Sequence, residues 1–195
     1  MEALLGANTA ARLDANYALK LSSERDVLSL ASWSLALAGD TTHAQAAGQE
    51  LERRYPSDTI AQRVYLPALR ADLETTGDKL SRAIEGLQAA VPYELALNGG
   101  TISMYAVYAR GKANVRARQG LAAAAEFQKI LDHPAIVMNS PIGPLARLGL
   151  AQAYAAAGDV TKSRVAYQDF FTLWKDADPD LPILVEARKQ YKSLQ

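Results

Sequence analysis

Lys112 and Arg116 mark the place in this sequence where residue types and spacing best suit binding chemistry. The two cations are four residues apart, and Tyr105 and Tyr108 precede them by one to two helical turns. Residues four apart lie on the same side of an α-helix, so one face combines cations with aromatic rings. Such a face could bind an extended peptide with an acidic group through charge-assisted hydrogen bonds. A solvated helix face with no partner is the alternative.

Three alternating carboxylates, Asp176, Asp178 and Asp180, resemble the start of a calcium-binding loop. An EF-hand loop also requires glycine at its sixth position and glutamate at its twelfth. This sequence has Leu181 and Ala187 at those positions. We therefore expect a polar turn in which Asp180 caps the next helix, and no metal site.

Catalytic motifs are missing from the rest of the sequence. It contains no cysteine, and its two histidines, His43 and His133, are far apart with no further ligand residue nearby. No Gly-x-Ser-x-Gly elbow and no glycine-rich phosphate loop followed by Lys-Ser/Thr occurs. The sequence therefore predicts a protein that is not an enzyme and binds no cofactor.

Composition predicts an all-α fold. Alanine, the strongest helix former, occurs 37 times among 195 residues. Basic and acidic residues balance at 21 each, so no net charge draws the chain to nucleic acid or anionic membranes. No apolar run approaches the ~20 residues that span a bilayer. We expect a cytoplasmic protein, or an extracytoplasmic one if a parent protein has a transmembrane helix before this region.

A recurring Gly-Asp pair divides the chain into helical hairpins. Glycine tolerates the left-handed conformation that ends a helix, and the following aspartate can cap the next helix. The pairs are Gly39-Asp40, Gly77-Asp78 and Gly158-Asp159, followed by the small residues Ala44, Ala83 and Ser163. In a third hairpin the corresponding turn is Arg118-Gln119-Gly120, which lacks the pair.

These turns predict one domain, 1–195, made of stacked hairpins. Its expected parts are a leading helix at 1–21, hairpins at 26–56, 59–92, 102–134 and 144–175, and a capping helix at 182–194. A loop is expected at 97–100. Pro67 falls inside the second hairpin and should kink or shorten its first helix, because proline lacks a backbone donor.

The hairpins resemble the tetratricopeptide repeat, most closely in the fourth hairpin. Its residues at matching places are Leu150, Ala151, Tyr154, Gly158, Ser163 and Tyr167. The third hairpin matches at Gly111, Ala123, Phe127 and Pro134, and departs at Asn114 and Arg118. The resemblance implies a right-handed superhelix that binds a protein or peptide in its concave groove.

The spacing of the hairpins is longer than that of the family. Gly39 and Gly77 are 38 residues apart, and Gly77 and Gly158 are 81 apart over two hairpins, against a family repeat of about 34. Insertions between hairpins would account for this difference. HEAT-like repeats of about 40–47 residues are the alternative.

Two segments, 122–133 and 166–180, resemble a narrower group. They are similar to the C-terminal tetratricopeptide region of bacterial, acidobacterial-type serine/threonine kinases and winged-helix regulators. This resemblance implies a second possible function, as a regulatory or sensor module of a multidomain signalling protein without catalytic activity of its own.

Repeat register extends the candidate site beyond one helix. Counting from Gly111 places residues of the first and fourth hairpins at equivalent groove positions. The predicted partner-binding set is Tyr105, Tyr108, Lys112, Arg116, Trp33 and Gln152. The identity of the partner and the oligomeric state stay open.

Overall fold

Helices form the regular structure of the chain throughout the part that can be described. The computed structural model describes residues 2–74, 77–96 and 104–194 and contains no β-strand in these ranges. In chain order the elements are α1 (Glu2–Leu5), α2 (Asn8–Leu21), α3 (Arg25–Leu37), α4 (Thr41–Arg54), a π-helix (Ala61–Tyr65), α5 (Leu66–Leu73), α6 (Gly77–Gly86), a 3-10 helix (Leu87–Tyr93), α7 (Tyr105–Arg116), α8 (Gly120–Asp132), α9 (Pro134–Val137), α10 (Ile142–Ala156), α11 (Val160–Leu173) and α12 (Pro182–Lys192). The prediction of an all-α fold is confirmed.

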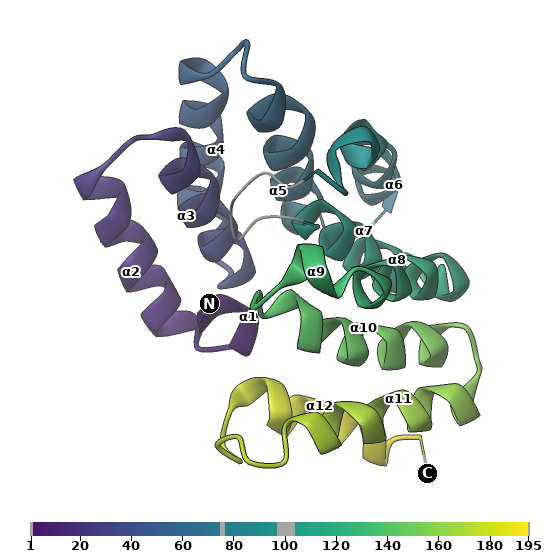
Figure 1. Ribbon diagram of the computed structural model, residues 1–195. Helices are drawn as coiled ribbons and strands as arrows, with labels where there is room; N and C mark the ends of the chain where they lie inside the picture. Colours follow the sequence, from purple (N-terminus) through teal and green to yellow (C-terminus); the bar gives the residue numbers. More distant parts are fainter. Residues whose placement is uncertain (1, 75–76, 97–103, 195) are drawn as a thin grey trace.

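Antiparallel hairpins follow one another along the chain. The pairs α3–α4, α7–α8 and α10–α11 pack against each other, and α3, α5, α7 and α10 each contact the next in that order. Figure 1 shows these helices arranged along an arc, with α1 on the inside of the arc and near α10. Residues on this inside face therefore come from hairpins that are distant in sequence.

Two Gly-Asp turns have the predicted structure. Gly39 and Gly158 adopt left-handed φ angles of +81° and +79°. The carboxylates of Asp40 and Asp159 each accept a hydrogen bond from a backbone N–H three residues later, at 3.2 and 3.0 Å. Sequence and structure therefore agree on how these hairpins turn and how their second helices begin.

The third turn has the same backbone path without glycine at its centre. Arg118 has a φ of +57°, and the N–H of Gln119 donates to the carbonyl of Asn114 at 2.9 Å. Asp40 and Asp159 make the equivalent bond to a carbonyl five residues back, at 2.8 and 2.9 Å. Gln119 makes no side-chain capping bond, so this turn keeps the shape but loses both favourable residues.

The second hairpin is less regular than predicted. A π-helix at Ala61–Tyr65 leads into α5, and the N–H of Leu66 donates five residues back, to Ala61. A π turn widens the helix just before Pro67, where the proline ring would otherwise clash with the preceding turn. Gly77 is the first residue of α6, and residues 75–76 lie outside the described ranges, as do the predicted loop at 97–100 and the start of the third hairpin at 102.

The first and last helices of the chain contact each other, and each departs from the prediction in one respect. The leading helix is interrupted at Gly6, whose φ is +84°, and a Cβ on Gly6 would lie 2.8 Å from the Cβ of Pro182. At the other end, α12 begins after Leu181 without a side-chain cap. The cap predicted for Asp180 is therefore wrong: its N–H donates at 3.0 Å to the carboxylate of Asp178 within the turn.

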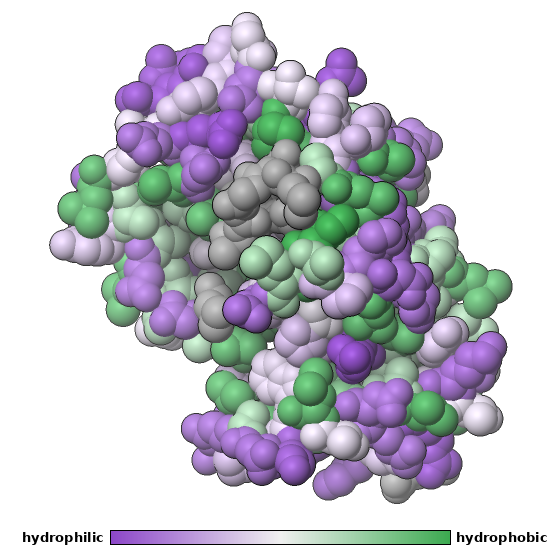
Figure 2. Space-filling model, in the orientation of Figure 1, coloured by the Kyte–Doolittle hydropathy of each residue, from purple (hydrophilic) through white to green (hydrophobic). Residues whose placement is uncertain are grey.

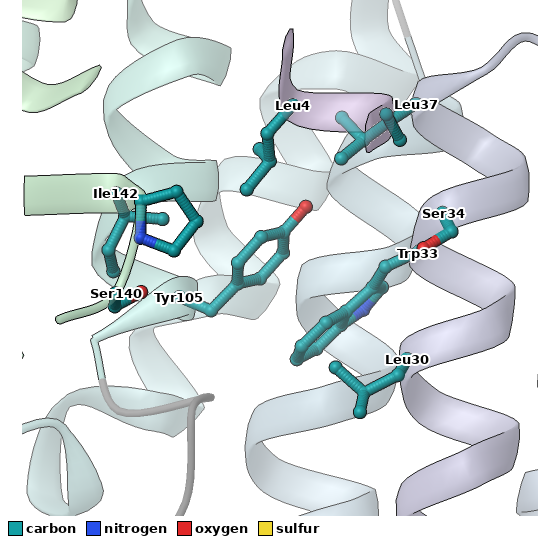
Figure 3. A pocket seen from close by; sticks show the side chains of 10 residues that line it. Leu4, Leu30, Trp33, Ser34, Leu37, Tyr105, Ser140 and Ile142 are labelled. Carbon is teal, nitrogen blue, oxygen red and sulfur yellow. The ribbon is translucent and has the colours of Figure 1, made fainter. Parts of the chain in front are cut away.

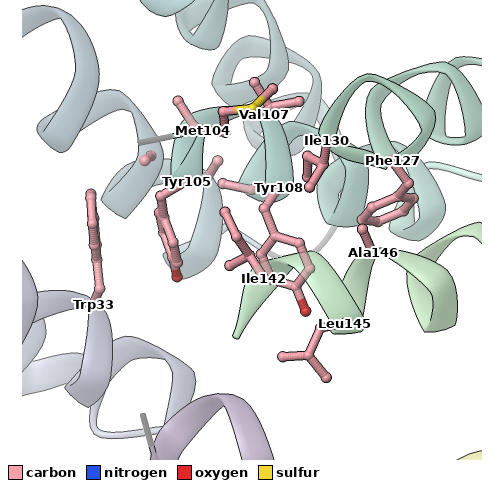
Figure 4. Packing of buried hydrophobic residues seen from close by; sticks show 14 of the residues in the cluster. Trp33, Met104, Tyr105, Val107, Tyr108, Phe127, Ile130, Ile142, Leu145 and Ala146 are labelled. Atoms are coloured by element: carbon pink, nitrogen blue, oxygen red, sulfur yellow. The ribbon is translucent and has the colours of Figure 1, made fainter. Parts of the chain in front are cut away.

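One continuous hydrophobic core joins the hairpins. Figure 4 shows Trp33 beside Tyr105, with Tyr108 and Phe127 following along the row. The Phe127 ring is fully buried. Cβ atoms on Gly111 of α7 and Gly149 of α10 would lie 2.8 and 2.4 Å from it. Because glycine has no side chain, α7 and α10 can both pack directly against the Phe127 ring, as close helix packing requires.

Exposed apolar residues gather along α2. Leu13, Tyr17 and Leu21 are 68%, 63% and 69% exposed, and their spacing of four places them on one side of the helix. Figure 2 shows hydrophobic residues at the edge of the molecule formed by α2. The outer face of the first long helix is thus not the polar cap typical of a repeat array.

Candidate functional site

Three helices carry the six residues that the sequence predicts as partner-binding. Trp33 lies on α3, four residues lie on α7, and Gln152 lies on α10. Five of the six come together around the start and inner face of α7. The four on α7 are Tyr105, Tyr108, Lys112 and Arg116.

Trp33 and Tyr105 form the aromatic centre of this group. Their rings stack with centroids 4.0 Å apart at an angle of 16°, and both residues are buried. The Trp33 indole N–H donates to the carbonyl of Tyr65 at 3.3 Å, and the Tyr65 ring meets the indole edge-on at 5.4 Å. Packing and one hydrogen bond therefore fix the orientation of the indole.

Asp72 on α5 is the centre of a polar cluster behind the aromatic pair. Its side chain is 1% exposed. The Tyr105 hydroxyl donates to one carboxylate oxygen at 2.9 Å, and Lys112 Nζ donates to the other at 2.7 Å. Burial raises the pKa of Tyr105 well above its usual value, and the charge of Asp72 raises it further. Burial also lowers the pKa of Lys112, outweighing the opposite effect of Asp72.

Both predicted cations bind groups within the chain. Besides Asp72, the Lys112 ammonium lies 5.1 Å from the centroid of the Tyr108 ring. Arg116 donates to the backbone carbonyl of Ala71 at the end of α5. The two cations tie α7 to α5, which differs from the expected arrangement in which they face an acidic partner.

Gln152 lies apart from the other predicted residues. Its amide donates to the side-chain oxygen of Gln190 on α12 at 3.0 Å, and the Tyr167 hydroxyl donates to the same oxygen at 2.8 Å. Gln152 therefore joins the last three long helices to one another.

An apolar pocket of about 270 Å³ opens beside the stacked rings. We call it the Trp33 pocket. It is lined by Ala3, Leu4, Leu30, Trp33, Ser34, Leu37, Tyr105, Ser140, Pro141 and Ile142. Figure 3 shows these side chains converging from α1, α3, α7 and the start of α10. Parts of the chain that are far apart in sequence thus build one hydrophobic site.

Part of the pocket carries a sequence signal that the prediction missed. Leu30, Trp33 and Leu37 recur at spacings of three and four, which places them on one face of α3. The contributions of Leu4 and Ile142 have no such signal, because they depend on how α1 and α10 meet α3. A groove of about 400 Å³ between α2 and α3 adjoins the pocket and shares Ala3, Leu30 and Ser34 with it.

A second buried ionic cluster lies on another side of α7. Arg110 donates to Glu94 and to Glu126, each at 2.6 Å, and Lys129 also pairs with Glu94. The side chains of Arg110 and Glu94 are 4% and 1% exposed. This cluster joins the 3-10 helix region to α7 and α8, and its pairing of opposite charges suits a structural role.

The remaining candidate ligands are dispersed. His43 pairs with Asp40 in its helix cap at 2.9 Å, and the His133 ring contacts the carbonyl of Lys129 at 2.8 Å. Within the described ranges, no group of three or more histidine, aspartate and glutamate side chains is placed to hold a metal ion.

No protein-family model, curated protein or solved structure matches this chain. The fold and the site define the class instead: an all-α protein of successive helical hairpins with an apolar pocket between them. Among the residues that the structure describes, no helix combines the length and the apolar character needed to cross a membrane.

Proposed function

We propose that this protein is a non-enzymatic, tetratricopeptide-like interaction module whose Trp33 pocket receives an apolar side chain of a partner protein. Support for the repeat class comes from the three hairpin turns with equivalent backbone hydrogen bonds. Arrays of this kind present extended surfaces to partners. We therefore assign partner binding to the surface that the hairpins form together.

The Trp33 pocket is the observation that carries this proposal. An apolar cavity of about 150 Å³ is large enough for benzene, so about 270 Å³ accommodates a large aliphatic or aromatic side chain. Leu30 at the pocket is 43% exposed, which makes the site accessible from outside. Binding energy at protein interfaces concentrates where such an anchor enters a well-packed pocket.

Charge pairing within the chain determines which anchor fits. Lys112 already binds Asp72, and Arg116 binds the carbonyl of Ala71. Lys112 is not available to a partner without breaking its ion pair with the buried Asp72 carboxylate, and neither cation lines the Trp33 pocket. The favoured anchor is therefore uncharged and apolar, in place of the acidic group that the sequence suggests.

Leu30→Glu tests the proposal because it places a charge at the pocket on a partly exposed residue. Leu121→Glu is the matched control, since Leu121 is 74% exposed on α8 and outside the pocket. Proteins captured from a lysate by the wild-type chain and by both variants are compared by mass spectrometry. Specific partners should be retained by Leu121→Glu and lost with Leu30→Glu.

Each captured partner is then tested as a purified protein by NMR. The Trp33 indole N–H signal should shift on binding, and that of Trp174 on the C-terminal side of α11 should not. Partners that bind wild type and Leu30→Glu with equal affinity would contradict the Trp33 pocket as the binding site. Both variants are first compared by circular dichroism, so that loss of binding is not confused with unfolding.

A further inference from the structure

Helix α1 occupies the inside of the arc by apolar contact. Leu4 is partly buried against the hydrophobic core and lines the Trp33 pocket. Figure 3 shows Leu4 extending from α1 toward the end of the Tyr105 ring, opposite Leu37. Among the described residues, no side-chain hydrogen bond or ion pair joins residues 2–5 to another element. Ala3 and Leu4 are thus the apolar residues by which α1 lines the pocket.

A sharp turn at Gly6 holds α1 in this place. Gly6 donates to Ala3 at 3.3 Å and Ala7 donates to Glu2 at 3.0 Å, while Gly6 has a left-handed φ of +84°. A Cβ here would lie 2.8 Å from the Cβ of Pro182. Two features therefore require glycine at position 6: its left-handed backbone angle, and its close approach to α12, which leaves no room for a Cβ.

We propose that α1 occupies, within its own chain, the place of the partner's anchoring segment. The partner is then a short helical turn with an aliphatic side chain that displaces Leu4 from the Trp33 pocket. This inference rests on the proposed function and specifies its partner and regulation. Leu4 forms part of the wall of the pocket of about 270 Å³. A partner side chain that also takes the place of Leu4 competes with α1, so apparent affinity is reduced by the fraction of molecules in which α1 stays bound.

The test uses a synthetic peptide of residues 1–8 added to the full chain. Gly6→Ala should release α1, since it adds both backbone strain and the contact with Pro182. Gly158→Ala is the matched control, because Gly158 has a φ of +79° and nothing within 4 Å of an added Cβ. Leu4→Asp is a second route to an open pocket that leaves Gly6 intact and decides the test if Gly6→Ala fails to fold.

Calorimetry and the Trp33 indole N–H signal report binding of the peptide. We expect at least ~10-fold tighter binding to Gly6→Ala and Leu4→Asp than to wild type and Gly158→Ala. The same peptide with Leu4 replaced by Asp should not bind. If the peptide binds wild type and the three folded variants equally, or binds none of them, the proposal that α1 is displaced by a partner is wrong. If partners are still lost with Leu30→Glu in that case, the proposed function stands and only the role of α1 fails.

Discussion

Asp72 and Lys112 form an ion pair between α5 and α7, with Nζ 2.7 Å from the carboxylate oxygen and the Asp72 side chain 1% exposed. Neither partner can be removed without leaving a charge in a poorly solvated place. Lys112 is therefore already paired within the chain, and this ion pair leads to the first prediction.

Asp72→Ala should lower the free energy of unfolding by about 3–5 kcal/mol, because Lys112 then loses its buried counter-ion. Lys112→Met should also destabilise the protein, because it removes the ion-pair partner of the buried Asp72 carboxylate. Urea denaturation of both single variants and of the double variant Asp72→Ala/Lys112→Met measures the coupling. The double variant should lose less than the sum of the two; strictly additive losses would disprove the coupling.

Stability should fall steeply above pH 10 because buried tyrosines resist ionisation. Burial raises the pKa of Tyr65 and of Tyr167 to about 12, whereas an unfolded tyrosine has a pKa near 10. Between pH 10 and about pH 12 the folded state keeps the phenol protons that the unfolded state has lost. The stabilisation that depends on the protonated phenols is therefore fully present below pH 10 and is lost as pH rises through about 12.

The slope should be about 1.4 kcal/mol per pH unit for each such tyrosine. Urea denaturation at pH 9, 10, 11 and 12 measures it, and absorbance at 295 nm follows the ionisation. Tyr65→Phe should reduce the slope by the share of one tyrosine. A stability that does not change up to pH 12 would contradict the burial of these phenols.

Arg118→Gly should stabilise the protein by about 1 kcal/mol, because it removes the strain of a left-handed backbone at a residue with a Cβ. Adding Gln119→Asp restores the capping carboxylate that Asp40 and Asp159 provide and should give a further gain of about 0.5–1 kcal/mol. Thermal unfolding followed by circular dichroism measures both steps. The reciprocal change Gly158→Arg should lower the midpoint, and a gain from it would refute the equivalence of the turns.

Gly120→Ala should be strongly destabilising, by about 3 kcal/mol. A Cβ at this position would lie 2.3 Å from the backbone nitrogen of Ala157 and 2.6 Å from the carbonyl oxygen of Ala153. Backbone atoms of α10 cannot rotate away as a side chain can, so α8 and α10 would have to separate.

Gly86→Ala is the control for this substitution, because nothing lies within 4 Å of an added Cβ in its helical environment. It should stabilise the protein by about 0.5–1 kcal/mol through helix propensity. Chemical denaturation of both variants gives the comparison. Similar effects of the two substitutions would contradict the close contact between α8 and α10.

Local features of the fold were predictable from the sequence, and contacts between distant hairpins were not. Gly39-Asp40 and Gly158-Asp159 act on the next few residues, so their roles as turn and cap follow from residue type alone. The same local reasoning failed at Asp180, because the helix begins two residues later, at Pro182, and the carboxylate of Asp178 accepts the bond inside the turn.

The candidate site was predictable only in part, for a related reason. Repeat register placed Trp33 and Tyr105 on the same groove, and in the structure their rings stack. It could not show that Asp72 on α5 would neutralise Lys112. The two residues are 40 positions apart in the sequence, and their pairing depends on how α5 packs against α7. Nor could it show that Leu4 would line the pocket, since no periodicity connects α1 to α7.

The contact between Gly6 and Pro182 has a consequence for how the molecule comes apart. A linear array of repeats frays from either end independently, because each unit contacts only its neighbours. Here the first turn of the chain rests on the first residue of its last long helix. Loosening of α1 therefore removes support from the start of α12, so these two helices should detach together.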